Sequence, residues 1–142
     1  MEYLEQFPIQ QKATPSLSSW GYKGYCEVWL NESNDWIYPV LHEASERMVG
    51  LANRYRDAQG DARRVLNQMA RELLLAQSSD WAFIMKTGTH TSYAAKRTLD
   101  HLERFKTLGG QLEKNVIDTK ELERIESTDN IFPDLNYKVY QS

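Results

Sequence analysis

A recurring helical pattern of apolar residues limits what this chain can fold into more than any other feature. From Ile37 to Phe105, apolar side chains recur three and four positions apart in stretches separated by short polar or glycine-containing breaks. This spacing places them on one face of an α-helix, whereas a half-buried strand would alternate at every second residue. Such helices become stable by burying their apolar faces against one another. The sequence therefore predicts an all-α fold, a helical bundle of about four helices.

Capping and breaking residues set the expected bounds of these helices. Asn34 and Asp35 are favourable N-caps for the first helix, and Ser78-Ser79-Asp80 interrupts the second, which then resumes for a turn or two. Gly109-Gly110 is expected to stop the third helix, because glycine is common just past helix ends. The expected helical ranges are 34–59, 61–77, 81–85, 91–109 and 118–127.

The two ends of the chain lack this pattern. Residues 1–20 begin with a short amphipathic piece, Glu2 to Phe7, and then pass through prolines and hydroxyl residues, which predicts an extended crossing segment. Residues 131–140 alternate apolar and polar side chains around Pro133, which predicts an extended C-terminal tail laid across the bundle. We expect these parts to form a single helical domain over residues 1–142.

Charge and composition limit the classes of partner. The 142-residue chain has a net charge of −3 with both signs spread along it, so no basic stripe predicts nucleic-acid binding. No apolar run is long enough to span a bilayer, and the first ten residues lack the apolar core of a signal peptide. The single Cys26 cannot form an internal disulfide, which is typical of a reducing compartment. We expect a cytoplasmic protein that binds neither nucleic acid nor membrane.

The sequence contains no known motif for a catalytic nucleophile or a metal site. There is no Gly-x-Ser-x-Gly sequence, and Cys26 has no neighbouring helix start or histidine to activate it. His42, His90 and His101 lack the spacing of a zinc site, and we expect His42 and His101 at the surface or as capping groups. Most carboxylates fall on polar helix faces, and no pair is singled out for acid–base catalysis. The sequence predicts no catalytic residue, no metal and no cofactor.

The segment from Trp20 to Trp29 is unusually rich in aromatic residues. It contains four large rings and two glycines, although a helix core does not need glycines and a half-buried strand would not place rings on both faces. A loop that holds flat rings suits a sugar, because a ring covers the apolar C–H face while polar groups bind the hydroxyls. The same rings would equally plug the bundle against residues 1–15, and the residues alone leave both interpretations open.

A second unusual place is Ser78-Ser79-Asp80-Trp81-Ala82-Phe83, where a polar triplet enters an apolar run and an aromatic residue follows at once. The acid at this place has two possible roles. Asp80 either caps the next helical turn or points into a cleft, where it would accept hydrogen bonds.

Several motifs that run through the chain in order resemble those of a known family. They are Ser19-Trp20-Gly21, Trp29-Leu30-Asn31, Asp35-Trp36-Ile37, Leu73 to Ile84, Gly88, Tyr93-Ala94, Arg97, His101, Phe105 and Asp129 to Tyr137. Together they resemble the C-terminal region of glycoside hydrolase family 57 α-1,4-glucan branching enzymes. The resemblance covers nearly the whole chain, and the long central motif is specific.

The resemblance implies a parent enzyme whose N-terminal (β/α)7 barrel carries a Glu nucleophile and an Asp acid/base. Such an enzyme cuts an α-1,4 link, holds the glucan as a covalent glycosyl-enzyme and passes it to a 6-hydroxyl, with retention of configuration. Both catalytic carboxylates belong to segments N-terminal to Met1, so no activity is expected for this chain alone. The implied partners are an α-glucan, such as amylose or glycogen, and the barrel of the same parent chain.

The resemblance also implies which residues of this chain contact the substrate. Trp20 and Trp29 match family tryptophans that contact the glucan. Asp80 and Trp81 fall in the last shared region of the family, whose acid and aromatic residue face the active-site cleft. Trp36 matches as well, but its place on the apolar side of the first helix makes core packing an equal alternative.

The sequence departs from the family pattern at two positions near these residues. Ala82 stands where many relatives have Pro, and Tyr25 stands where another Gly is common. Amylases and glucanotransferases of the family share a similar last region, while the Trp20 loop and Ile131-Phe132-Pro133 favour branching. The alternative from a different class is a free-standing, non-catalytic helical module that binds glucan or another partner.

Overall fold

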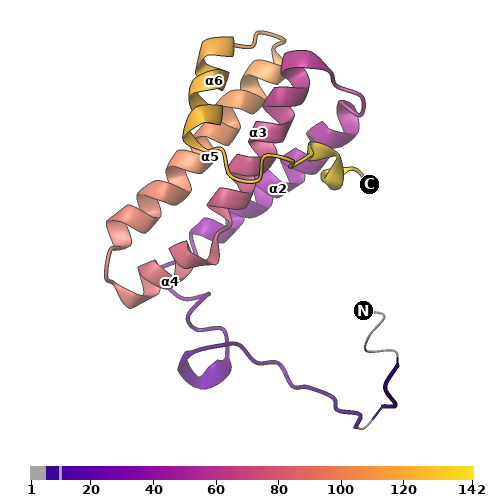
Figure 1. Cartoon of the computed structure of the whole chain (residues 1–142). Helices are drawn as coiled ribbons and strands as arrows, with labels where there is room; N and C mark the ends of the chain where they lie inside the picture. Colours follow the sequence, from indigo (N-terminus) through magenta and orange to yellow (C-terminus); the bar gives the residue numbers. More distant parts are fainter. Residues whose placement is uncertain (1–5, 10) are drawn as a thin grey trace.

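The computed structural model describes residues 6–9 and 11–142, and within these ranges it contains helices and no strand (Figure 1). The α-helices are α2 (Ile37–Arg54), α3 (Gly60–Ala76), α4 (Ser79–Thr87), α5 (Thr91–Glu113) and α6 (Thr119–Thr128). Short 3-10 helices, η1 (Tyr22–Gly24) and η2 (Tyr137–Tyr140), lie in the N-terminal loop and the C-terminal tail. The predicted all-α bundle is confirmed. No helix in the described ranges has the length and apolar character needed to cross a membrane.

Helix α3 lies at the centre of the bundle. It packs against α2, α5, α6 and η2, as its position in Figure 1 also shows. A helix with neighbours on several sides needs apolar residues around more of its circumference than one stripe provides. The apolar residues of α3 that are completely buried are Val65, Leu66, Met69, Ala70 and Leu73.

Helix α5 runs through the two glycines that were expected to stop it. It continues to Glu113, so the predicted end at Gly109-Gly110 is wrong. A Cβ atom at Gly109 would lie 2.9 Å from Met69 Cε and 3.0 Å from Arg47 Nη2. Gly109 therefore serves close packing of α5 against its neighbours, and the chain leaves the helix only at Lys114.

The C-terminal tail crosses the bundle and closes the turn between α2 and α3. From Asp129 the chain runs back across α3 to η2 beside α2, as expected for the tail (Figure 1). The completely buried Tyr137 places its hydroxyl 2.7 Å from the Tyr55 carbonyl oxygen and 3.2 Å from the Ala58 nitrogen. It thereby satisfies backbone groups that follow the end of α2 at Arg54, earlier than the expected end near residue 59.

The N-terminal segment differs from its expected course. Residues 11–18 are exposed and extended, but they run away from the bundle instead of crossing it (Figure 1). The amphipathic piece expected at residues 2–7 falls largely outside the described residues. The aromatic loop that follows lies against α4, and it forms the candidate site described below.

The two glycines of α5 give opposite expectations for substitution. Gly110→Ala should raise the free energy of unfolding by about 0.5–1 kcal/mol, because alanine favours the helix and no atom lies within 4 Å of its Cβ. Gly109→Val should lower it by about 1–3 kcal/mol, because the added side chain overlaps Met69 and Arg47. Urea denaturation of both variants measures the difference. Equal effects at the two positions would contradict a packing role for Gly109.

Candidate functional site

Three aromatic rings, two from the N-terminal loop and one from α4, meet at one end of the molecule. The ring centroids of Trp20 and Trp29 lie 6.3 Å apart, and Phe83 of α4 lies 5.9 Å from Trp20 and 6.1 Å from Trp29. The rings are tilted by 37–47° relative to one another. Trp20 remains 69% exposed, whereas Trp29 is half-buried against the core. We call this group the aromatic cluster, and it presents an apolar platform to solvent.

Glycines and short hydrogen bonds hold the loop that carries Trp20 and Trp29. Gly21 has a φ of +80°, and a Cβ atom there would lie 2.9 Å from Val28 Cγ2, so only glycine fits without distortion. The Ser19 hydroxyl accepts a hydrogen bond from the Cys26 N–H at 2.7 Å, and the Ser19 N–H donates to the Gly24 carbonyl at 2.7 Å. These bonds close the loop on itself and fix the direction in which Trp20 leaves the backbone.

A buried asparagine anchors the loop to α4. Asn34 is 0% exposed, and its Oδ1 accepts a hydrogen bond from the Asn31 N–H at 2.9 Å. Its Nδ2 donates to the carbonyl oxygens of Val28 at 3.0 Å and Ala82 at 3.1 Å. Asn34 was expected as an N-cap, but α2 begins only at Ile37 and the side chain joins two segments instead. Loss of this side chain would remove the hydrogen bonds that join the loop to α4.

Trp29 is fixed from a second side. The Tyr38 hydroxyl on the first turn of α2 donates a hydrogen bond to the Trp29 carbonyl oxygen. Burial raises the pKa of the Tyr38 hydroxyl, so it stays protonated and remains a donor. The backbone of Trp29 is therefore set by contacts that do not involve its indole ring, which leaves the ring free for the aromatic cluster.

The predicted residues Asp80 and Trp81 lie outside the aromatic cluster. Trp81 and Phe83 are two positions apart on α4, so they leave opposite sides of the helix. The Trp81 indole N–H donates to the Leu75 carbonyl at 2.8 Å, and its ring meets Tyr93 of α5 edge-on at 6.1 Å. Asp80 is exposed in the first turn of α4 and accepts a hydrogen bond from the Ser78 hydroxyl at 3.0 Å.

The alternative that Trp36 packs in the core is wrong. Trp36 precedes α2 as its N-cap residue and is 39% exposed. The core position that follows it is occupied by Ile37, which is 3% exposed. Trp36 instead lines a surface groove of about 390 Å³ together with Val40, Leu99 and other residues of α2 and α5.

A polar cluster that the sequence did not predict lies in the middle of the bundle. Glu72 of α3 and His101 of α5 are both 0% exposed, and Asp129 after α6 is 7% exposed. The expectation that His101 lies at the surface is therefore wrong, and Glu72 and Asp129 are not at solvated positions. The Glu72 Oε2 atom lies 2.7 Å from His101 Nδ1, and the Asp129 carboxylate lies 3.7 Å from that same nitrogen.

The sequence spacing of Glu72 and His101 could have predicted that both side chains are buried in the bundle. His101 continues the buried stripe of α5, and Glu72 continues the buried stripe of α3 at the same three- and four-residue spacing. On α5 the stripe is Ala94, Thr98, His101, Phe105, Leu108 and Leu112, and on α3 it is Val65, Met69, Glu72 and Ala76. A polar residue inside such a stripe indicates a buried partner on the facing helix.

Two guanidinium groups balance the charge of this cluster. Arg97 Nη2 lies 3.0 Å from His101 Nε2, and because arginine only donates, the histidine proton is on Nδ1 and points to Glu72. Arg104 forms an ion pair with Asp129. Two carboxylates and two guanidinium groups thus surround a neutral imidazole.

The balance of charge also determines what the cluster can bind. Possible ligand atoms of Glu72, His101 and Asp129 all lie within 4.8 Å of one another, which is close enough to hold a cation. A metal ion would however add positive charge beside two arginines that already neutralise the carboxylates.

Burial raises the pKa of the Glu72 carboxyl group, while hydrogen bonds from His101 and Gln68 act against that shift. We interpret the cluster as a structural connection between α3, α5 and the tail.

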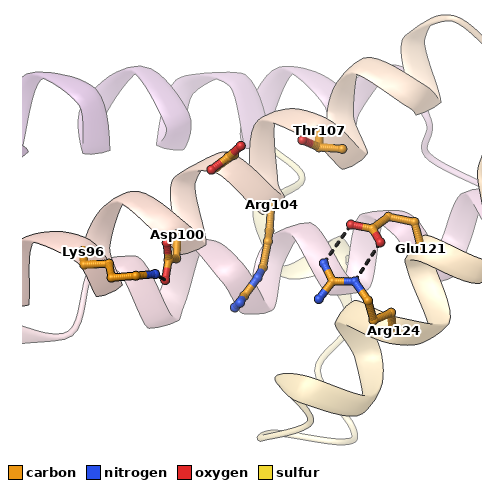
Figure 2. A pocket seen from close by; sticks show the side chains of 7 residues that line it. Lys96, Asp100, Arg104, Thr107, Glu121 and Arg124 are labelled. Carbon is orange, nitrogen blue, oxygen red and sulfur yellow. Dashed lines mark hydrogen bonds and ion pairs between the residues drawn. The ribbon is translucent and has the colours of Figure 1, made fainter. Parts of the chain in front are cut away.

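A charged pocket of about 290 Å³ lies between α5 and α6 (Figure 2). Figure 2 shows that four of its charged groups are paired within the protein: Lys96 binds Asp100 at 2.6 Å, and Arg124 binds Glu121 at 2.8 Å. These hydrogen bonds lower the pKa values of the two carboxyl groups, so both stay charged. Arg104 lies between the two pairs and forms its ion pair with Asp129. Of the charged groups that line this pocket, only the Glu103 carboxylate has no partner among the described residues.

Comparisons with known proteins identify the family of this chain. A family model described as "1,4-alpha-glucan branching enzyme, C-terminal" matches residues 40–140. The 1,4-alpha-glucan branching enzyme of Thermococcus kodakarensis is 38% identical over 118 residues, which make up 80% of this chain and 18% of that protein. Its crystal structure, determined in complex with glucose and additives, superposes with a TM-score of 0.90, 33% identity and coverage of 99% of this chain and 26% of that one.

Two further solved structures are similar. The GH57-type branching enzyme of Pyrococcus horikoshii has a TM-score of 0.88 and 36% identity, over 99% of this chain and 28% of that one. The alpha-amylase AmyC of Thermotoga maritima has a TM-score of 0.79 and 46% identity, over 98% of this chain and 25% of that one. The chain thus spans between 18% and 28% of the length of these relatives.

The buried polar cluster gives a direct test of the bundle. Glu72→Ala should lower the free energy of unfolding by about 3–5 kcal/mol, because it removes the buried carboxylate that pairs with His101 and Arg104. Glu103→Ala, at an exposed position of α5, is the control and should leave stability unchanged. Chemical denaturation monitored by circular dichroism measures both. A loss below about 1 kcal/mol at Glu72 would show that the cluster does not hold the helices together.

Proposed function

The chain belongs to the family of C-terminal domains of 1,4-alpha-glucan branching enzymes, and we propose that it is the glucan-contacting domain of such an enzyme. The whole enzyme would cut an α-1,4 link and transfer the chain to a 6-hydroxyl, as in the synthesis of glycogen in the cytoplasm. The catalytic carboxylates would belong to an N-terminal barrel, and residues 1–142 would serve as one C-terminal domain. The observation that carries the proposal is the exposed aromatic cluster.

The aromatic cluster has the properties of a sugar platform. Trp20 is 69% exposed, so folding alone does not explain a large ring held in a fixed place by contacts with Trp29 and Phe83. The apolar C–H faces of glucose units would lie on such rings, and the rigid loop would reduce the entropy lost on binding. This arrangement favours binding over the alternative that the rings plug the bundle, because the ring of Trp20 is mostly in solvent.

The remaining predicted residues receive separate roles in this proposal. Asp80 is exposed at the start of α4 and has acceptor capacity left for a glucan hydroxyl. The Trp81 N–H is already bonded to Leu75 and its ring is packed on Tyr93, which supports a role in holding α4 in place. Direct contact with glucan is therefore proposed for Trp20, Trp29 and Asp80, and a positioning role for Trp81.

The groove at the start of α2 would face the rest of the parent enzyme. Trp36 is 39% exposed and Leu99 is 51% exposed, and both line this groove of about 390 Å³ with Val40 and Leu102. Exposed apolar surface of this kind is typical of an interface. The much greater length of the relatives supports a partner within the same polypeptide.

A hydrolase domain is the second candidate function. Identity with the amylase AmyC is 46%, compared with 36% for the Pyrococcus horikoshii branching enzyme. Both candidates share the glucan platform, because transfer and hydrolysis differ in what attacks the covalent intermediate at the catalytic residues. A free-standing module that binds glucan without catalysis would use the same rings. The reading frame upstream of Met1 distinguishes this module from a domain of an enzyme.

Substitution of Trp20 tests the proposed platform. Trp20→Ala should weaken maltoheptaose binding about tenfold, corresponding to the roughly 1–2 kcal/mol of an aromatic contact, with little change in melting temperature. Isothermal titration calorimetry and thermal unfolding measure the two effects. Tyr25→Ala is the matched control, because Tyr25 is also 69% exposed in the same loop but makes no ring contact among the described residues. Its affinity should stay unchanged.

The outcome for Trp29 separates binding from packing. Trp29 is half-buried, so Trp29→Ala should weaken binding to a similar degree and also lower the melting temperature. A large stability loss in both tryptophan variants with unchanged affinity would make the rings structural and the proposed function wrong.

A further inference from the structure

A second pocket lies beside the aromatic cluster on the same loop. Its volume is about 470 Å³, which is room for a sugar unit with its bound water. One exposed aromatic ring and several polar side chains line it, namely Tyr22, Glu27, Asn31, Glu32, Ser33 and Lys86. Neither the family resemblance nor the predicted site residues include any group of this pocket except Asn31.

Some polar side chains of this pocket are hydrogen-bonded within the protein, and others have no partner there. Asn31 and Ser33 serve the fold, because Asn31 Nδ2 donates to the Glu27 carbonyl at 2.9 Å and Asn31 Oδ1 accepts from Ser33. The side chains of Glu27, Glu32 and Lys86 form no hydrogen bond or ion pair with any other described residue. The Glu27 Oε2 atom is even buried without a partner.

Unused buried acceptors are rare in folded proteins and need an explanation. The pocket between α5 and α6 shows the ordinary situation, in which Lys96, Asp100, Glu121 and Arg124 neutralise one another (Figure 2). In the loop pocket, by contrast, carboxylates and an ammonium group remain available together. That difference, rather than volume, singles out the loop pocket as a ligand site.

The loop pocket is continuous with the aromatic cluster. Phe83 and Lys86 are three positions apart on α4, so they are neighbours on one face of the helix. Tyr22 and Glu27 each lie two positions from a tryptophan of the cluster. The hydrogen bonds of Ser19 with Cys26 and Gly24 close the loop that carries them. A linear ligand that lies on the cluster would therefore extend into the pocket.

The chemistry of the free groups points to a neutral polyol. A divalent cation would be repelled by Lys86, and an anion would be repelled by Glu27 and Glu32. Sugar hydroxyls both donate to carboxylates and accept from an ammonium group, and the Tyr22 ring, 59% exposed, would cover a C–H face. We infer that this pocket is a second saccharide subsite, which receives glucose units adjoining those on the aromatic cluster. The inference rests on the proposed glucan binding.

Calorimetric titration with maltotriose and maltoheptaose tests the inference. Lys86→Ala and Glu27→Gln should each weaken maltoheptaose binding by about fivefold to tenfold, because each removes a hydrogen bond to a charged group. Their effect on maltotriose, which is short enough to stay on the rings, should be much smaller. Lys114→Ala, at an exposed position at the end of α5, is the control. Glu32→Gln provides a third, exposed variant in case Glu27→Gln disturbs the loop.

The outcomes separate this subsite from the platform. If Trp20→Ala weakens binding of maltoheptaose while Lys86→Ala, Glu27→Gln and Glu32→Gln bind it like the wild type, the subsite is wrong and the platform stands. If the wild-type chain binds neither oligosaccharide, both the proposed function and the proposed subsite are wrong. A loss confined to the longer glucan in the pocket variants supports the subsite.

Discussion

The buried carboxylate of Glu72 is the interaction on which the rest of the structure depends. Its side chain lies at the centre of the bundle without contact with water, and one oxygen binds Gln68 while the other binds His101. Desolvation of a charge is expensive, so the buried carboxylate needs His101 and Arg104 of α5 as partners. Arg104 also pairs with Asp129, which joins the tail to the same cluster. The polar cluster thereby selects one arrangement of α3, α5 and the tail among those that apolar packing alone would allow.

The position of the aromatic cluster follows from this arrangement. Helix α4 packs on α5, and the hydrogen bond from Trp81 to Leu75 fixes it to the end of α3. Asn34 then joins the loop to the Ala82 carbonyl of α4, which brings Trp20 and Trp29 to Phe83. A site on a glycine-rich loop is thus held by rigid helices, and this reduces the entropy that a glucan would lose on binding.

The sequence predicted the helices because apolar spacing records which face of each helix is buried. It did not predict the roles of His101, Gly109 or Asn34, because each depends on a partner distant in the sequence. A histidine in an apolar stripe becomes a core residue only when Glu72 faces it, and a glycine becomes a packing residue only when Met69 approaches it. The position of Trp20 beside Phe83 likewise depends on the Asn34 bonds, although both residues belong to motifs that the sequence singled out.

The most direct test of this account follows the indole N–H signals of the four tryptophans by NMR during titration with maltoheptaose. The account predicts saturable shifts for Trp20 and Trp29, whose rings form the platform. The signal of Trp81 should remain in place, because its N–H is bonded to the Leu75 carbonyl. Unchanged signals of Trp20 and Trp29 at saturating glucan, or a shift of Trp81 alone, would contradict the central claim that the aromatic cluster binds glucan.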